Sequence, residues 1–432
     1  MLANLKREYS FFCSNPLPMR TLLLTNLIFS MVLPIIELFT GAYIIRNSAD
    51  FSLVMVFQLA QGTGIPVGFI LNWFMLAKVP VKRLYSLGMM MSGLAMASMM
   101  LQTEPGLAGV SLAGLLMGVS YGFFWANRTT LALSATQNTN RNYFYGMETF
   151  FYTFAVIVMP MLAGWFIAAS HSWAWFGNNV NGAYYVLTGL VFILTIVAST
   201  LLQRGDYRNL PKARLKFRGF HRLWQKMLRM AVLKGLAQGY ITTAPVMLIM
   251  KLVGKEGELG TIQSTGAILS AGMLYLLGRK TSPQHRLKVY ALGLGLFWIG
   301  AFTNMVAYSA AGVIVFVGCL VFARPLMDLA YFPIQLGVIE YVSKKEKHSA
   351  FNYIFTHELG LYVGRVFGCG LFILIARFVS EDFALRYVLA FITTLQLSSL
   401  YVARTIMGDR AWQESATEDL KSVEMLKKPV AV

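Results

Sequence analysis

The sequence predicts an all-helical integral membrane protein, and three observations support this fold class. Of its 432 residues, 56% are hydrophobic and only 13% are charged, against about 25% charged in an average soluble domain. The apolar residues are gathered in long runs that continue to about Met407. Most runs hold about the 20 residues that a helix needs to cross the hydrocarbon core of a bilayer. This composition excludes a soluble enzyme, a disordered chain and a nucleic-acid-binding protein.

Twelve apolar runs are predicted to be transmembrane helices, because a helix satisfies its own backbone polar groups in lipid. An N-terminal signal peptide is not expected, because the first run is too long and lacks a cleavage site. The first six spans are Met19–Ile45, Phe51–Leu76, Leu84–Leu101, Leu107–Leu133, Phe144–Ala169 and Ala183–Leu202. The second six are Met230–Val253, Gly257–Leu277, Val289–Ser309, Val313–Val342, Phe351–Phe378 and Phe383–Ile406.

The distribution of Lys and Arg predicts the orientation of these spans. The segments on the side that holds both termini contain 28 of the 37 basic residues, and the opposite side contains 5. Because positive charge accumulates on the cytoplasmic side, both termini are expected in the cytoplasm. The protein is then a multi-pass protein of the cell membrane, either a bacterial inner membrane or a plasma membrane. The net charge of +18 is explained mostly by this asymmetry and not by a polyanionic partner.

A long basic segment divides the chain. We expect an N-terminal six-helix bundle at 1–203, a basic cytoplasmic linker at 204–229, a C-terminal six-helix bundle at 230–407 and a cytoplasmic tail at 408–432. The linker interleaves basic and aromatic residues, which favours a segment lying on the anionic inner leaflet. A regulatory or nucleic-acid role is the alternative interpretation of the linker.

Short motifs recur in the two bundles. Asn142-Tyr143, followed by Glu148, recurs 210 positions later as Asn352-Tyr353, followed by Glu358. These motifs occupy the fifth span of each bundle. A Tyr-x-Leu-Gly motif also recurs, at Tyr85 and at Tyr290, near the start of each third span. The chain is therefore predicted to contain two parallel six-helix repeats, which could enclose a site at the middle of the membrane.

This architecture resembles the major facilitator superfamily over nearly the whole chain. The resemblance implies a transporter with two parallel six-helix repeats. The signature between the second and third spans is present as Gly68-x-x-x-Asn72, followed by basic residues from Lys78, so an amide replaces the family's Asp. The exporter-type motif of the fifth span survives only as Pro160 and Gly164. No subfamily and no transport direction follow from these motifs.

Ionisable residues inside the predicted spans are candidate functional groups, because each costs on the order of 3 kcal/mol at bilayer depth. Depth counting from the turns predicts two groups of them. The first is a central cluster of Arg324, Asp328 and Arg365, which we expect to bind substrate; a structural charge network is the alternative. The embedded residues are the acids Glu37, Glu148, Asp328 and Glu358, the bases Arg128, Lys234, Arg324 and Arg365, and His357.

The second group is expected nearer the cytoplasm. Arg128 and Glu148 lie eleven and nine residues from the turn between the fourth and fifth spans, so they are at similar depth. We predict that they pair, in a gating or structural role. Glu358 and Lys234 are assigned to the same depth.

Proton coupling is assigned to three residues. Glu37, just after Pro34, has no evident partner, and burial favours the neutral form of a carboxyl group. It is therefore the first candidate for carrying a transported proton, and a carboxyl hydrogen-bonded to a neighbouring helix is the alternative. Glu358 and His357 are further candidates. No metal site is expected, because no further His or Cys lies at ligand spacing.

Other polar residues and six prolines also lie within the spans. Proline breaks a backbone hydrogen bond and kinks a helix, so some of these positions are expected to shape a cavity. The prolines are Pro34, Pro66, Pro160, Pro245, Pro325 and Pro333. The polar candidates for a cavity wall are Gln58, Gln61, Trp125, Asn127, Gln238, Tyr331 and Gln335.

Together these features predict a secondary active transporter that moves a small organic solute by alternating access, with protons as the coupling ion. An enzyme is not expected, because the chain has neither a nucleophile–base set nor a P-loop. No cofactor is expected. The expected partners are the solute, protons and the lipid bilayer, with no nucleic acid and with the chain as a monomer. A non-transporting receptor or scaffold on a transporter fold is the alternative function.

Overall fold

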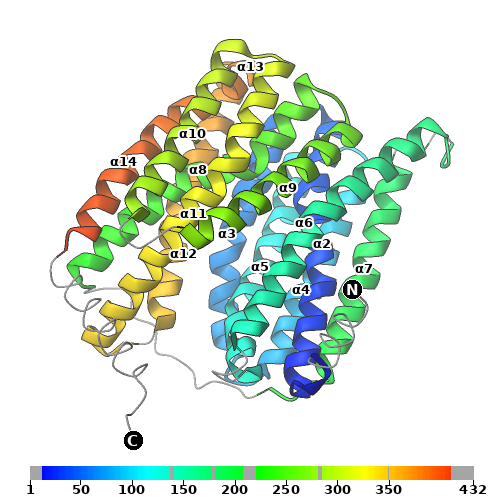
Figure 1. Cartoon of the computed structure of the whole chain (residues 1–432). Coiled ribbons are helices and arrows are strands. Elements are labelled where there is room, and N and C mark those ends of the chain that lie inside the picture. Colours follow the sequence, from blue (N-terminus) through cyan, green and yellow to red (C-terminus); the bar gives the residue numbers. More distant parts are fainter. Residues whose placement is uncertain are drawn as a thin grey trace, which may run out of the picture.

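The computed structural model describes residues 12–136, 141–177, 179, 181–207, 220–280, 285–348 and 350–409, which form long helices (Figure 1). The first half of the chain contains α2 (Leu17–Ser48), α3 (Phe51–Met75), α4 (Val81–Met100), α5 (Leu107–Ala135), α6 (Arg141–Ser172) and α7 (Gly182–Gln203). The second half contains α8 (Arg222–Leu252), α9 (Glu256–Lys280), α10 (Arg286–Ala307), α11 (Ala310–Glu346), α12 (Ala350–Phe378), α13 (Glu381–Phe383), the π-helical turn η2 (Ala384–Val388) and α14 (Leu389–Met407).

Ten helical segments in the described part of the chain are long and apolar enough to cross a membrane. This confirms an all-helical, multi-pass membrane protein. Helices α4 and α9 are not among the ten, so the number of twelve spans stays a prediction. The N-terminal arm, the middle of the predicted linker (208–219), the side chain of Arg141 and the tail from 410 onward lie outside the described residues.

The described ends of the chain lie on one side of the helices, which we call the terminal face. Thr21, near the start of α2, shares a hydrogen bond of 2.8 Å with Tyr207, just after α7. Lys226, near the start of α8, pairs with Asp409, just after α14. The opposite side, the distal face, carries α13 (Figure 1).

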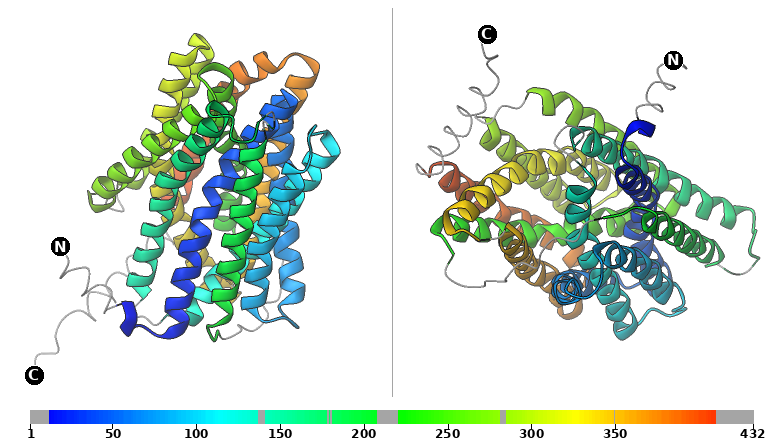
Figure 2. Two further views of the ribbon diagram at one scale, coloured as in Figure 1. Left: turned by 90° about the vertical axis from the view of Figure 1, so that its right-hand side faces the viewer. Right: turned by 90° about the horizontal axis from the view of Figure 1, so that it is seen from below.

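The two halves lie side by side (Figure 2) and pack in the same order. In the first half, α2 packs on α6 and α7, α3 on α5, and α4 on α5 and α7. In the second half, α8 packs on α12 and α14, α9 on α11, and α10 on α11 and α14. Two copies of one bundle would give this correspondence, which supports the predicted repeat without establishing it.

Glycines let several helices approach closely, as small residues do in membrane proteins. A Cβ atom added at Gly64 of α3 would lie 2.3 Å from the carbonyl oxygen of Leu115 on α5. One added at Gly364 of α12 would lie 2.1 Å from that of Val232 on α8. These helix pairs are therefore held at backbone contact within each half.

Candidate functional site

A cavity of about 680 Å³ lies between the two halves. Its wall is built from α2, α3, α5 and α6 of the first half and from α8, α10, α11, α12 and α14 of the second. Six of the eight residues predicted for the site line this one cavity. They are Glu37, Arg324, Asp328, His357, Glu358 and Arg365.

The central cluster is paired differently from the prediction. The carboxylate of Asp328 accepts a hydrogen bond of 2.8 Å from Lys234 on α8, not from Arg324 or Arg365. The Lys234 ammonium also lies 4.0 Å from the ring centre of Tyr331 and 4.2 Å from that of Phe332. Lys234 thus joins α8 to α11 across the cavity wall.

Arg365 is held by its own helix and by α8. Its guanidinium donates a hydrogen bond of 2.8 Å to Glu358, seven residues earlier on α12. It also donates to the side-chain oxygen of Gln238 at 2.9 and 3.2 Å. Glu358 and Arg365 therefore share one helix face, as their spacing predicts.

Lys234 pairs with Asp328 and therefore lies with the central cluster, not with Arg128 and Glu148 as predicted. Glu358 lines the same cavity, and its depth stays a prediction. Helix α8 begins at Arg222, eight residues before the predicted start at Met230. Lys234 is therefore twelve residues into the helix, about 18 Å from its start at 1.5 Å per residue. The basic and aromatic first turns of α8 concealed this start.

His357 lies on α12 beside the central pairs. Its Nε2 atom shares a hydrogen bond of 2.6 Å with the hydroxyl of Tyr331 on α11, and both side chains are buried. The imidazole and the phenol thereby join α11 to α12 next to Lys234. This contact gives His357 a defined position in the wall.

Glu37 and Arg324 lie on opposite halves of the molecule, and both line the cavity. Glu37 lies on α2 and Arg324 on α11, and both side chains are exposed to the interior space. They interact electrostatically, although the described residues provide neither of them with an ion pair or a hydrogen bond. Glu37 therefore has a charged neighbour that the sequence did not reveal.

The cavity wall also contains buried polar atoms that have no hydrogen-bond partner among the described residues. They are the hydroxyl oxygen of Tyr121 and the side-chain oxygens of Gln335 and Gln396. Six of the seven polar candidates named from the sequence line the cavity; the exception is Asn127, which is fully buried against α3. The wall residues that sequence reasoning missed include Tyr121, Tyr152, Tyr290 and Gln396. The one feature of the sequence that could have indicated them is a polar group within an apolar run.

Arg128 and Glu148 form the predicted pair, outside the central cavity. The Arg128 guanidinium donates two hydrogen bonds to the Glu148 carboxylate, one of them at 3.0 Å. Asn26 of α2 donates a third at 2.7 Å and itself accepts one from the Tyr85 hydroxyl at 2.9 Å. The pair therefore joins α5 to α6, and the amide extends this network to α2 and α4.

The amide at the signature position has its own partner. Asn72 is fully buried on α3, and its side-chain oxygen accepts a hydrogen bond of 2.6 Å from Asn127 on α5. A neutral contact between α3 and α5 thus occupies the position of the family's acidic residue. It lies within the first half.

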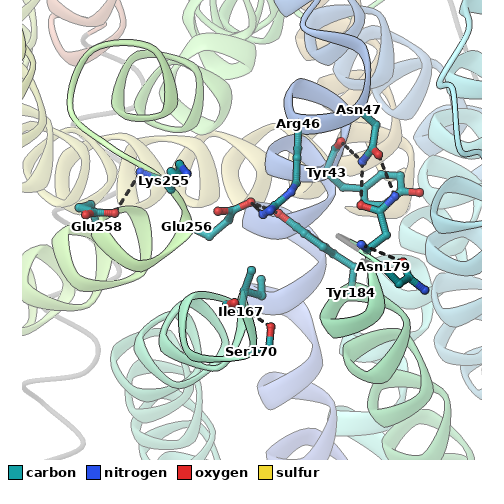
Figure 3. Close-up of polar contacts among 11 residues, drawn as sticks. Tyr43, Arg46, Asn47, Ile167, Ser170, Asn179, Tyr184, Lys255, Glu256 and Glu258 are labelled. Carbon is teal, nitrogen blue, oxygen red and sulfur yellow. Dashed lines mark hydrogen bonds and ion pairs between the residues drawn. The ribbon is translucent and has the colours of Figure 1, made fainter. Parts of the chain in front are cut away.

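The distal face joins the two halves through an ion pair (Figure 3). Arg46 at the end of α2 donates to Glu256 at the start of α9, and the Tyr184 hydroxyl of α7 donates to the same carboxylate oxygen at 2.8 Å. Glu256 is only 3% exposed. Close by, the backbone N–H of Phe51 donates to Glu381 at 3.0 Å.

Nearer the terminal face, a different contact joins the two halves. Phe69 of α3 packs on Phe355 and Phe351 of α12, with ring centres 6.3 and 6.4 Å apart. The polar distal contact and this aromatic contact lie at opposite ends of the central cavity.

Two related proteins are described only as uncharacterized. The chain is 23% identical over 369 residues to the uncharacterized protein YqgE of Bacillus subtilis (strain 168), covering 84% of each chain. It is 24% identical over 133 residues to an uncharacterized protein in the sodM 3′ region of Geobacillus stearothermophilus, covering 31% of this chain and 62% of that protein.

Two solved structures with the same fold are transporters. The POT family transporter PepTSo matches with a TM-score of 0.66 and 9% identity, over 92% of this chain and 99% of that one. A bacterial metal transporter matches with a TM-score of 0.60 and 14% identity, over 91% and 99%. At these identities the likeness shows the fold alone. The family model of the Major Facilitator Superfamily matches residues 21–368. The chain therefore belongs to the Major Facilitator Superfamily of membrane transporters.

Proposed function

We propose that this protein is a secondary active transporter that moves a small organic solute through its central cavity by alternating access. The observation that carries the proposal is the cavity between the halves, with Lys234, Asp328, Glu358 and Arg365 in its wall. Charged groups at this depth are costly unless they are paired or serve a ligand. Arg324, Asp328 and Arg365 form the proposed substrate-binding set.

Alternating access requires that the cavity open to one side at a time. The Arg46–Glu256 pair closes the distal side in our proposal, and the contact of Phe69 with α12 closes the terminal side. Each half would move as a rigid body, so the helix ends at the two faces would separate in turn. Arg128 and Glu148 hold the terminal end of the first half together during this motion.

Protons are the proposed coupling ion, and Glu37 is the proposed carrier. Its carboxyl group faces the cavity and forms no ion pair within the described part of the chain. A carboxyl in this position can take up a proton when the cavity faces one side and release it when it faces the other. Glu358 and His357 are the secondary candidates.

The excess of basic residues on the terminal face supports a cell-membrane protein with both termini in the cytoplasm. This orientation makes the distal face the outer one.

Transport by purified protein in proteoliposomes tests the proposal. A thermal-shift screen with a metabolite panel first selects a solute, since a ligand of the folded state raises its stability. An imposed pH gradient should then drive uptake of that solute against its concentration gradient. Glu37→Gln should abolish gradient-driven accumulation and keep solute exchange, while Glu104→Gln, at an exposed loop position, should change neither. Wild-type uptake that ignores the pH gradient would remove the proton mechanism, and absence of any solute movement would favour a receptor.

A further inference from the structure

Arg324 is the one cation of the central cavity that forms neither an ion pair nor a hydrogen bond with the described residues. Lys234 is paired with Asp328, and Arg365 with Glu358. The Arg324 side chain is exposed to the cavity without an ion pair or a hydrogen bond. A guanidinium in this state can still donate five hydrogen bonds in a planar fork.

Glu37 is the corresponding unpaired acid, and it lies on the other half of the molecule. The titratable groups around it are Arg324 of α11, Tyr121 of α5 and Tyr152 of α6. A guanidinium stays protonated in proteins, whereas a carboxylate can be neutralised by one proton. When Glu37 carries that proton, the cavity wall has three cations and two anions, and the unbalanced charge is on Arg324.

A second, smaller cavity opens beside these two residues. It has a volume of about 170 Å³ and shares Glu37 and Arg324 with the main cavity. Most of its wall is apolar, with Leu320 and Val156 among the wall residues. Four of the six prolines in the spans meet there, one each from α2, α6, α8 and α11: Pro34, Pro160, Pro245 and Pro325.

We propose that the solute is an organic monoanion, whose anionic group binds Arg324 and whose apolar body occupies the smaller cavity. One proton, bound to Glu37, accompanies the anion, so that the loaded cavity is neutral. A carboxylate fits the planar fork of a guanidinium through two parallel hydrogen bonds. The charged group then lies between the halves at the junction of the two cavities, and this placement rests on the proposed function.

Binding to the purified protein tests the solute class without transport. The probes are straight-chain and aromatic monocarboxylates of four to ten carbons, the matching amides, and the matching amines. We expect thermal stabilisation by carboxylates of suitable length and none by the amides or amines. Arg324→Gln should weaken the best carboxylate at least tenfold, and Arg324→Lys should weaken it less. Arg377→Gln, an exposed arginine at the end of α12, should leave binding unchanged.

The apolar subsite has its own variant. Ala267 lies in the wall of the smaller cavity, so Ala267→Leu should weaken long carboxylates at least fivefold and leave the four-carbon acid unchanged. Ala310→Leu, at the exposed start of α11, is the matched control. Equal effects on short and long acids would remove the subsite.

The net charge moved in each transport cycle, measured in proteoliposomes, tests whether one proton accompanies the anion. Uptake of the anion with one proton carries no net charge, so a pH gradient should drive it and a potassium-diffusion potential should not. Binding of amines alone, no stabilisation by any carboxylate, or full affinity in a folded Arg324→Gln variant would overturn the solute class while leaving transport itself in place. Arg324-dependent binding without uptake would instead overturn the proposed function and keep the anion site.

Discussion

Arg128 holds a carboxylate that is buried at the terminal end of the first half. The Glu148 side chain is only 9% exposed and accepts hydrogen bonds from Arg128 and Asn26. Removing one partner of a buried ion pair costs about 3 kcal/mol or more, because the other charge is left uncompensated. We therefore expect Arg128→Ala to lower the thermal unfolding temperature strongly. The exchanged pair, Arg128→Glu with Glu148→Arg, should recover much of the loss.

An exposed pair provides the comparison. Lys344 and Glu340 lie one turn apart on α11 with side chains 61% and 68% exposed. Such surface pairs contribute less than about 1 kcal/mol, so Lys344→Ala should scarcely change the unfolding temperature. If the Arg128 variant were equally tolerated, the Arg128–Glu148 pair would not hold the helices together.

Asp50 predicts a pH dependence on the distal face. It caps α3, and burial favours its neutral form, but hydrogen bonds from the hydroxyl and the backbone N–H of Ser52 stabilise the carboxylate and lower the pKa of Asp50. A carboxyl with a lowered pKa in the folded state stabilises the fold above its unfolded pKa, and this contribution is lost as the pH falls through the folded value. The difference in unfolding temperature between wild type and Asp50→Asn should therefore be largest near neutral pH and shrink below about pH 4. Asp206→Asn, at an exposed position, is the matched control.

The sequence predicted the contacts of some charged residues correctly and those of others wrongly. Arg128 and Glu148 were paired correctly because one short turn connects their helices, so depth alone brought them together. Lys234 was misplaced because no local signal marked the true start of α8. Depth counting also cannot say which way a side chain points around its helix, and this is why Asp328 was assigned to Arg324 and Arg365.

Helices α6 and α9 form the tightest contact between the halves, and glycines make it possible. A Cβ atom at Gly260 of α9 would lie 2.3 Å from the carbonyl oxygen of Pro160 on α6. Gly260→Ala must therefore push the two helices apart, and overpacking of this kind costs about 1–3 kcal/mol. We expect a lower unfolding temperature and a changed transport rate.

Gly189 of α7 is the control for this substitution, because a Cβ atom there would meet nothing within 4 Å. Gly189→Ala should be neutral or stabilising by up to about 1 kcal/mol, since alanine favours a helix more than glycine does. Equal behaviour of the two variants would show that α6 and α9 can separate without cost.

At the scale of helices, the apolar runs predicted most of the observed elements. The ends of α7 and α12 fall within a residue of the prediction. The π-helical turn at Ala384–Val388 left no trace in the sequence. The close helix contacts at Gly164 and Gly260 also could not be predicted, because they depend on which helices of the two halves pack against each other.

In the proposed alternating-access cycle, the distal ion pair is expected to keep the distal side closed. Arg46→Ala would leave Glu256 buried with the Tyr184 hydroxyl, which weakens the closed distal face. A cysteine at Val246, only 1% exposed on α8, should then react several-fold faster with a membrane-impermeant maleimide added from the distal side. Lys255→Ala, next to Glu256 but exposed, should leave this rate unchanged. An unchanged rate in the Arg46→Ala variant would show that the pair does not close the distal side.

Composition and charge distribution were sufficient to predict a multi-pass helical membrane protein, because these properties follow from the solvent around the chain. The existence of one charged cavity followed less directly, from the cost of placing ionisable groups in lipid. Its side cavity and the unpaired state of Arg324 required the structure, because both depend on residues from α2, α6, α8, α9 and α11 that meet only after folding.

The proposed transport requires motion between the two halves, and a reversible cross-link at the distal face would block that motion. A Cβ atom at Gly41 of α2 would lie 3.4 Å from Cγ1 of Val246 on α8, so cysteines at both positions can be joined. With Cys13, Cys319 and Cys369 replaced, we predict that oxidation of the Gly41→Cys/Val246→Cys protein stops transport in proteoliposomes. Reduction should restore it, and each single variant should transport under both conditions. Undiminished transport by the fully cross-linked protein would contradict the account.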